Sequence, residues 1–204
     1  MKARKPIAAL AALALAVGCS IFEPRDPEDP DPTTGWQQPY TYPTVIVNLE
    51  NVLEDLSADF YMLCFDTSFV FVADDQDTAQ YAWNFQNWDY IQEQNAISLI
   101  IGEALGDTTM PPESIASATF FEPPGLPDPV DYEDSIEIYR QYEIAFESSS
   151  RPPARGLAYL YLGKPAGTSG LWSIYRWEDN RLEDHGPDDN TWGVFKGFYL
   201  FGKL

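Results

Sequence analysis

The sequence is short of basic residues, cysteine and histidine, and each shortage excludes a class of function. It holds 12 Lys and Arg against 32 Asp and Glu, which gives a formal charge of −20. Proteins that bind the phosphate backbone of nucleic acids need a basic patch, so that class is excluded. The 2 cysteines cannot build a disulfide scaffold, and the 1 histidine has no aspartate arranged with it in a nucleophile motif.

A glycine-rich phosphate loop and a metal-ligand spacing are also missing, so no cofactor and no metal are predicted. Apolar residues, in contrast, are plentiful: 45% of the chain is hydrophobic and 15% is aromatic. This composition excludes intrinsic disorder for most of the length. A domain of about 160 residues buries roughly 70% of its unfolded surface, which is enough for a core without disulfides or metals.

The N-terminus carries a predicted export signal. Three basic residues precede an apolar run at residues 7–18, which is too short to cross a bilayer but typical of a secretory signal. The run ends in the letters LAVGC at residues 15–19, which resemble the bacterial lipobox, where a small residue precedes a lipidated cysteine. We therefore predict a signal peptide over residues 1–18 and lipidation of Cys19. The alternative is ordinary cleavage beside an incidental cysteine.

Lipidation of Cys19 would attach the protein to a membrane by its acyl chains and leave the rest of the chain outside the bilayer. Ser20 is not the Asp that commonly retains lipoproteins at the inner membrane. This favours the outer membrane of a Gram-negative cell, on the periplasmic side or at the cell surface.

A tether is predicted over residues 19–43, between this anchor and the domain. Six prolines and five acidic residues lie between residues 20 and 43, which is typical of an extended, self-repelling linker. Its last part, residues 35–42, is expected to pack onto the edge of the domain. One domain is placed at residues 44–204, and Cys64, in an apolar run, is predicted to be a buried structural thiol.

The domain begins with helical periodicity and ends with strand-like alternation. Helices are predicted from about residue 44 to 56, over 58–64 and over 89–105. Strands are predicted over residues 68–73, 114–122, 135–148, 154–164, 170–178 and 191–201. Short turns join several of the later strands, so these are expected to pair antiparallel. Helices followed by a strand meander indicate an α+β fold.

Several stretches resemble bacterial lipoproteins of the nuclear transport factor 2-like superfamily, also called the cone or ketosteroid-isomerase-like fold. These stretches are NVLEDL at residues 51–56, DFY at 59–61, FVF at 69–71, LWSIYRWED at 171–179 and TWGVFK at 191–196. The resemblance covers about residues 44–200. It implies an α+β domain whose N-terminal helices pack in the concave face of a curved antiparallel sheet. It implies no single chemistry, because the superfamily includes enzymes, binding proteins and scaffolds.

Two arginines fall on predicted apolar faces and are candidates for ligand binding. Alternation places Arg140 on the face of Tyr142, and it places Arg176 on the face of Trp172. Other aromatic residues considered for the concave face are Tyr139, Tyr159, Tyr161, Tyr175 and Trp177. The predicted ligand-binding residues are Arg140, Tyr142, Trp172 and Arg176.

A buried arginine must be paired, which leaves two interpretations of Arg140. In the first, it forms an ion pair with a helix carboxylate, such as Glu54 or Asp59. In the second, it holds an anionic ligand in the pocket. Arg176 raises the same question.

Acidic residues are concentrated in the first part of the domain. Residues 44–135 carry 18 acidic residues and no base, whereas residues 136–204 carry nine acidic residues and eight bases. The acidic part is interpreted as a solvated face, with a surface for divalent cations or a basic partner as the alternative. The densest cluster, residues 74–78, lacks the glycine and the distant glutamate of a calcium loop, so a loop after a strand is predicted there.

The sequence is compatible with three functions. The favoured one is an envelope-anchored, non-catalytic lipoprotein whose cone domain binds a small molecule or an envelope protein, or serves as a scaffold. The second is an enzyme resembling ketosteroid isomerases and polyketide cyclases, with an acid and a tyrosine in the cone. The third is a glycan-binding module that uses exposed aromatic residues, with Trp83 and Trp88 as candidates. A homodimer through the outer face of the sheet is left open.

Overall fold

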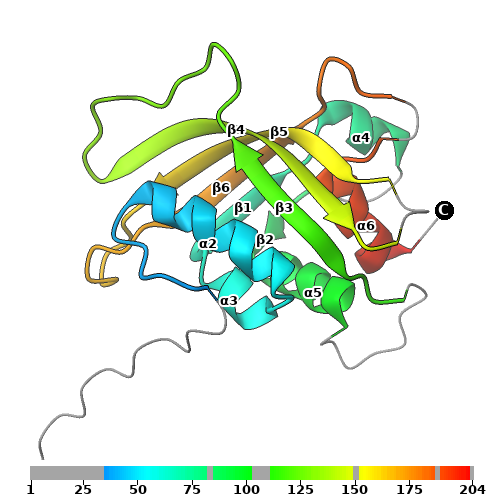
Figure 1. Cartoon of the computed structure of the whole chain (residues 1–204), viewed down its shortest axis with the longest axis horizontal. Helices are drawn as coiled ribbons and strands as arrows, with labels where there is room; N and C mark the ends of the chain where they lie inside the picture. Colours follow the sequence, from blue (N-terminus) through cyan, green and yellow to red (C-terminus); the bar gives the residue numbers. More distant parts are fainter. Residues whose placement is uncertain (1–34, 82–84, 103–110, 149–151, 187–188, 203–204) are drawn as a thin grey trace, which may run out of the picture. The chain divides into compact units, whose positions relative to one another are not determined.

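The computed structural model describes residues 35–81, 85–102, 111–148, 152–186 and 189–202 (Figure 1). The predicted signal peptide, Cys19, most of the tether, and Trp83 lie outside these residues. Within the described residues, no helix has the length and apolar character needed to cross a bilayer.

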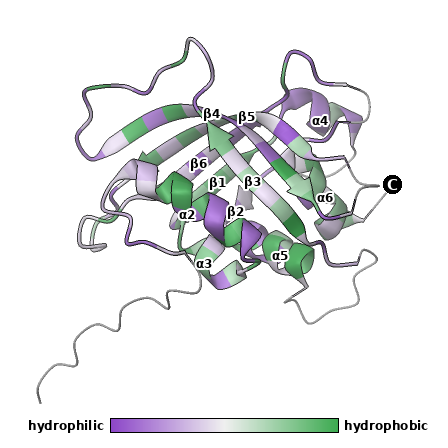
Figure 2. Ribbon diagram, in the orientation of Figure 1, coloured by the Kyte–Doolittle hydropathy of each residue, from purple (hydrophilic) through white to green (hydrophobic). Residues whose placement is uncertain are grey.

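A curved sheet of six strands forms the body of the domain. Its spatial order is β2-β1-β6-β5-β4-β3. The strands are β1 (Phe65–Val72), β2 (Trp88–Asp89), β3 (Ile115–Phe121), β4 (Ser135–Phe146), β5 (Ala154–Gly163) and β6 (Ser173–Asn180). Apolar and polar residues alternate along β4 and β5, as Figure 2 shows, so one face of each strand is buried.

The sheet is mixed, which corrects the prediction of a purely antiparallel one. Pairing is antiparallel from β3 through β4 and β5 to β6, and between β1 and β2, but β1 pairs with β6 in parallel. Parallel neighbours need a long connection. The chain between β1 and β6 supplies one, because it holds all the other strands and α5.

Three helices lie beneath the concave face, as predicted: α2 (Tyr42–Glu54), α3 (Ala58–Met62) and α5 (Tyr90–Ile101) (Figure 1). The helix α2 buries an apolar stripe that includes Val45, Leu49 and Val52, and it packs against β3. Asp89 caps the start of α5, because its side chain accepts hydrogen bonds from backbone N–H groups of the first turn. Gly102, in a left-handed conformation, caps the end of this helix. Cys64 is buried, as predicted.

The segment predicted as the last strand is a helix, α6 (Trp192–Phe201). The side chain of Thr191 caps it by accepting a hydrogen bond from the N–H of Val194, at 3.2 Å. Aromatic residues are enriched in strands, which favoured the wrong assignment. The buried residues Trp192, Phe195 and Tyr199 recur at helical spacing instead, so packing inside the domain decides the conformation.

The acidic cluster at residues 74–78 is also helical rather than a loop. It starts the short helix α4 (Asp75–Gln80), and the side chain of Asp74 caps this helix by accepting from the N–H of Gln76, at 2.7 Å. Acidic side chains stabilise the first turn of a helix because they face unpaired N–H groups there. Asp77 is buried and binds the Arg181 guanidinium, with Nε 2.7 Å from Oδ1.

Candidate functional site

Arg140 is buried and forms an ion pair, but its partner is not the one expected. Its guanidinium makes a two-pronged contact with the carboxylate of Asp128, with Nη1 2.6 Å from Oδ1. Tyr42 donates to the same carboxylate at 3.1 Å, and burial, followed by Asp128, raises the pKa of this tyrosine to about 12. Asp128 belongs to the loop between β3 and β4, so Arg140 holds this loop against the domain.

Of the two helix carboxylates proposed as partners of Arg140, Glu54 and Asp59, that of Glu54 binds a backbone group instead. Glu54 accepts a hydrogen bond from the backbone N–H of Ala118 at 3.0 Å, and Glu50 accepts from the N–H of Phe120 at 2.7 Å. Both amides lie on β3, which is an edge strand. Two glutamates of α2 therefore satisfy backbone groups that the sheet leaves unpaired.

Tyr142 lies inside the cone and is bonded to an acid that the sequence analysis did not single out. Its hydroxyl donates to Asp179 Oδ1 at 2.6 Å and accepts from the backbone N–H of Trp192 at 2.8 Å. The other oxygen of Asp179 accepts from the N–H of Gly193 at 2.7 Å. Burial raises the pKa of Asp179 to about 7, although the hydrogen bonds from Tyr142 and Gly193 lower it in part. The pair therefore binds the first turn of α6.

A second buried polar group fixes the middle of α6. Lys196 is fully buried, with Nζ 2.7 Å from Oε2 of Glu93 on α5. Tyr61 donates to Glu93 Oε1 at 2.6 Å, and Trp88 donates to Oε2 at 2.8 Å. The Lys196 ammonium also lies 3.4 Å from the centroid of the Phe71 ring. Burial lowers the pKa of Lys196, and the negative charge of Glu93 opposes that shift.

Among the described residues, buried side chains of α6 and of the sheet occupy the hollow of the cone. The helix α6 contributes Trp192, Phe195 and Lys196, and the sheet contributes Tyr142 and Trp177; each of these side chains is at most 2% exposed. Sequence reasoning missed this arrangement because it treated residues 191–201 as a strand. The presence of a lysine among five aromatic residues in that segment was the available signal.

Arg176 lies on the outer face of the sheet, which corrects its predicted position. Strand β6 is irregular: Ile174 is opposite Leu162 and Arg176 is opposite Tyr161, so Tyr175 is an extra residue in β6. One extra residue reverses every later side chain. Arg176 therefore leaves the face of Ile174 and binds Glu178 on the outside, with Nε 2.7 Å from Oε1.

Four other tyrosines considered for the concave face also lie on the outer face, where they are half-buried. Neighbouring rings on β4 and β5, those of Tyr139 and Tyr159, stack with centroids 4.3 Å apart. Tyr161 and Tyr175 extend the same row. These side chains therefore contact one another outside the cone.

Trp172 lines an open groove at one end of the domain, which we call the Trp172 groove. It has a volume of about 500 Å³. Its walls come from the N-terminal segment, the end of α3, the start of β1, the start of α5 and the turn before β6. The lining residues are Trp36, Gln38, Pro39, Met62, Leu63, Phe65, Asp66, Thr67, Tyr90, Pro165, Ala166, Thr168, Leu171, Trp172 and Ser173.

The N-terminal wall of the groove is held in place by specific hydrogen bonds. Asn48 is fully buried, and its side chain makes two hydrogen bonds to the backbone of Gln37. It accepts from the Gln37 N–H at 2.9 Å and donates to the Gln37 carbonyl at 2.6 Å. The backbone N–H of Trp172 donates to the carbonyl of Pro39 at 2.8 Å. Residues 35–42 therefore pack onto the domain edge, as predicted, and Trp36 lies in the groove wall.

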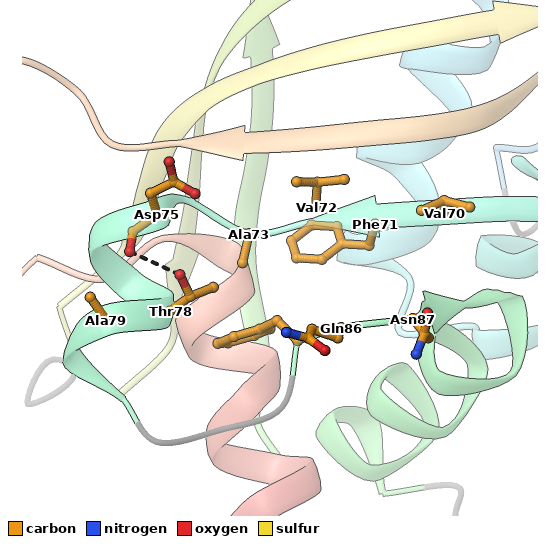
Figure 3. A pocket seen from close by; sticks show the side chains of 10 residues that line it. Val70, Phe71, Val72, Ala73, Asp75, Thr78, Ala79, Gln86 and Asn87 are labelled. Carbon is orange, nitrogen blue, oxygen red and sulfur yellow. Dashed lines mark hydrogen bonds between the residues drawn. The ribbon is translucent and has the colours of Figure 1, made fainter.

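A larger hollow of about 730 Å³ lies between α4 and the end of β1, and contains none of the predicted site residues. Figure 3 shows Asp75 and Thr78 of α4 on one side and Val72 of β1 on the other. Thr78 donates to the Asp75 carbonyl at 2.8 Å. Residues 82–84 connect two of its walls in sequence and lie outside the described residues, so this hollow carries no site here.

Trp88, a candidate for glycan stacking, is not at the surface. Its ring is 1% exposed and packs against Phe71 and Phe85. Stacking on a sugar requires an exposed ring face, so Trp88 does not serve that role. Trp83, the other candidate, lies outside the described residues.

No protein-family model matches the chain, and no curated protein matches it. Among solved structures, a nuclear transport factor 2-like protein of unknown function from Pseudomonas putida has a TM-score of 0.45 at 9% identity, over 72% of this chain and 89% of that chain. A protein of unknown function from Mycobacterium tuberculosis has a TM-score of 0.45 at 11% identity, over 69% and 70%.

A protein from Novosphingobium aromaticivorans, whose name proposes an aromatic ring hydroxylase, has a TM-score of 0.47 at 9% identity, over 78% of this chain and 96% of that chain. At this identity a likeness concerns the fold and no activity. The described architecture itself is that of an α+β cone fold, with helices in the hollow of a curved sheet.

Proposed function

We propose that the protein is an envelope-anchored, non-catalytic binding lipoprotein whose ligand occupies the Trp172 groove. The observation that carries this proposal is the contrast between two regions. The interior of the cone is filled by α6, whereas the groove at its end is open and lined mainly by apolar side chains. Open apolar hollows with a few polar groups are the usual form of small-molecule sites.

The polar groups inside the cone support a binding role rather than catalysis. An enzyme of the ketosteroid-isomerase type would use an acid and a tyrosine, and Asp179 with Tyr142 has that composition. Both oxygens of Asp179, however, are bonded to Tyr142 and to the N–H of Gly193. A general base needs an oxygen that can reach the substrate proton, so this pair serves α6 instead.

Ligand binding in the Trp172 groove is tested with the uncharged fluorescent probe N-phenyl-1-naphthylamine. Saturable enhancement of probe fluorescence is expected, with affinity reduced severalfold by Leu63→Gln. Leu63 is 55% exposed and lines the groove, so this change should preserve folding. The matched control is Leu126→Gln, because Leu126 is 40% exposed and does not line the groove. Absence of saturable binding, or equal loss in both variants, would overturn the proposed binding site.

The membrane anchor is tested separately at Cys19. In a Gram-negative host, the wild-type chain should incorporate labelled palmitate and fractionate with the outer membrane. Cys19→Ser should lose both properties, because the thiol is the acceptor of the lipid. Release of wild-type protein as an unlabelled, soluble chain would contradict the anchor while leaving the groove proposal intact.

A further inference from the structure

We infer that the ligand of the Trp172 groove is a cationic amphiphile: a small organic ammonium compound with an aromatic body, whose charge is bound by Asp66. This inference rests on the proposed function, because it assigns a ligand class to the same groove. It follows from the charges that line the groove, from the free oxygen of Asp66 and from the apolar walls.

The groove is lined by one carboxylate and by no base. Among its lining residues, Asp66 and Tyr90 are the ionisable ones, and no lysine or arginine is among them. An anionic ligand would therefore meet a like charge and no partner, whereas a cation would meet a partner. This reverses the anionic ligand that the sequence suggested for Arg140 and Arg176, since neither arginine lines the groove.

Asp66 has one oxygen available. Its Oδ1 accepts hydrogen bonds from both the backbone N–H and the hydroxyl of Ser68, the former at 2.8 Å. Within the described parts of the chain, Oδ2 accepts no hydrogen bond and no cation lies within ion-pair distance of Asp66. The Ser68 contacts hold the carboxylate in one orientation, so its free oxygen is pre-positioned for an ammonium donor.

The remaining walls suit a compact aromatic body. Leu171 and the exposed side chain of Leu63 supply apolar surface in the groove, whereas Trp172 is 2% exposed and contributes little open surface.

The charge of the surrounding surface favours the same ligand class. Residues 44–135 contribute 18 acidic residues and no base, so the net charge of this part of the chain favours the approach of cations. Lys164 is the base that borders the adjoining notch, which Asp66 also lines. Its ammonium is 2.9 Å from Asp134 and 5.0 Å from the centroid of the Trp172 ring, so it is already paired.

The experiment compares three compounds that share one body and differ in charge. These are 2-(1-naphthyl)ethylamine, 2-(1-naphthyl)ethanol and 1-naphthaleneacetate, titrated by calorimetry into the protein at low and at moderate salt. The amine should bind roughly tenfold more tightly than the alcohol, because a hydrogen bond to a charged group exceeds one to a neutral group. The carboxylate should bind most weakly.

Asp66→Asn removes the charge and keeps an oxygen that can accept from Ser68. In this variant the amine should fall to the affinity of the alcohol, and the alcohol should be unchanged. Glu122→Gln is the matched control, since it removes one exposed acidic charge that does not line the groove. Equal binding of amine and alcohol, or an unchanged amine affinity in Asp66→Asn, would overturn the inference while saturable naphthyl binding upheld the proposed function. Failure of all three compounds and of the uncharged probe would overturn both.

Discussion

The Tyr142 ring lies so close to the backbone of the opposite residue, Gly156, that only glycine fits at that position. Tyr142 on β4 is paired with Gly156 on β5. A Cβ placed on Gly156 would lie 2.7 Å from Cζ of the Tyr142 ring, which is closer than real Cβ atoms approach. The glycine therefore lets the tyrosine hydroxyl reach Asp179 and the first turn of α6.

Substitution of this glycine should loosen α6 without touching it. Gly156→Ala should displace the Tyr142 ring and lower the free energy of unfolding by about 1–3 kcal/mol, the usual cost of overpacking. Urea unfolding measures the loss. Gly186→Ala is the control, because its Cβ would meet its nearest neighbour, Asp189, at an ordinary 3.4 Å. Equal stability of the two variants would contradict the close approach.

Removing one partner of the buried Lys196–Glu93 pair should destabilise the fold more than removing the charges of both. Lys196→Met leaves the Glu93 carboxylate buried without its cation, which should lower the free energy of unfolding by about 3–5 kcal/mol. The double variant Lys196→Met with Glu93→Gln removes both charges and should recover much of that loss. A double-mutant cycle by chemical denaturation measures the coupling. Additive losses would indicate that the two side chains do not interact.

Asp179 should make stability depend on pH in a direction opposite to that of ordinary surface acids. Its pKa is raised from 3.8 to about 7 by burial, so the fold disfavours the carboxylate. The stability that the protonated group contributes is fully present below pH 3.8 and is lost as the pH rises to about 7, by up to about 1.4 kcal/mol per pH unit.

Asp179→Asn removes this titration. The wild type should therefore lose stability relative to Asp179→Asn as the pH rises from 4.5 to 7.5, whatever the absolute cost of the substitution. Unfolding free energies at several pH values measure the difference. The exposed-acid variant Glu122→Gln should show no such trend, and a constant difference for Asp179→Asn would rule out the raised pKa.

Arg140 is expected to hold a loop rather than a ligand. Arg140→Met removes the partner of Asp128, so the loop between β3 and β4 should open more often and be cut faster by a protease specific for acidic residues. The protease should cleave the loop of Arg176→Met at the wild-type rate. The Arg176 side chain is 39% exposed, so the loss of its ion pair costs little stability. Binding of the uncharged naphthyl probe should be the same in both variants. Loss of probe binding in Arg140→Met alone would instead support a ligand-binding role for Arg140.

The amino-acid sequence alone determined several of the elements and the faces that they bury. Periodicity located α2 and α5, and alternation located β4 and β5, because these elements place many residues on one apolar face. The stretches at residues 51–56 and 171–179 carried the likeness to the cone fold. The acidic character of residues 44–135 was equally explicit in the sequence.

Tertiary structure decided the points at which local pattern and packing disagree. Residues 192–201 have a strand-like composition but form the helix α6. This helix packs in the hollow of the sheet, where Lys196 forms an ion pair with Glu93. One extra residue at Tyr175 turns Arg176 outward, and no local pattern announces such a bulge. Arg140 finds its carboxylate in a loop whose path only the folded chain defines. The Trp172 groove likewise arises where several parts of the chain, most of them distant in sequence, leave a space among them. Periodicity along one segment carries no information about such a space.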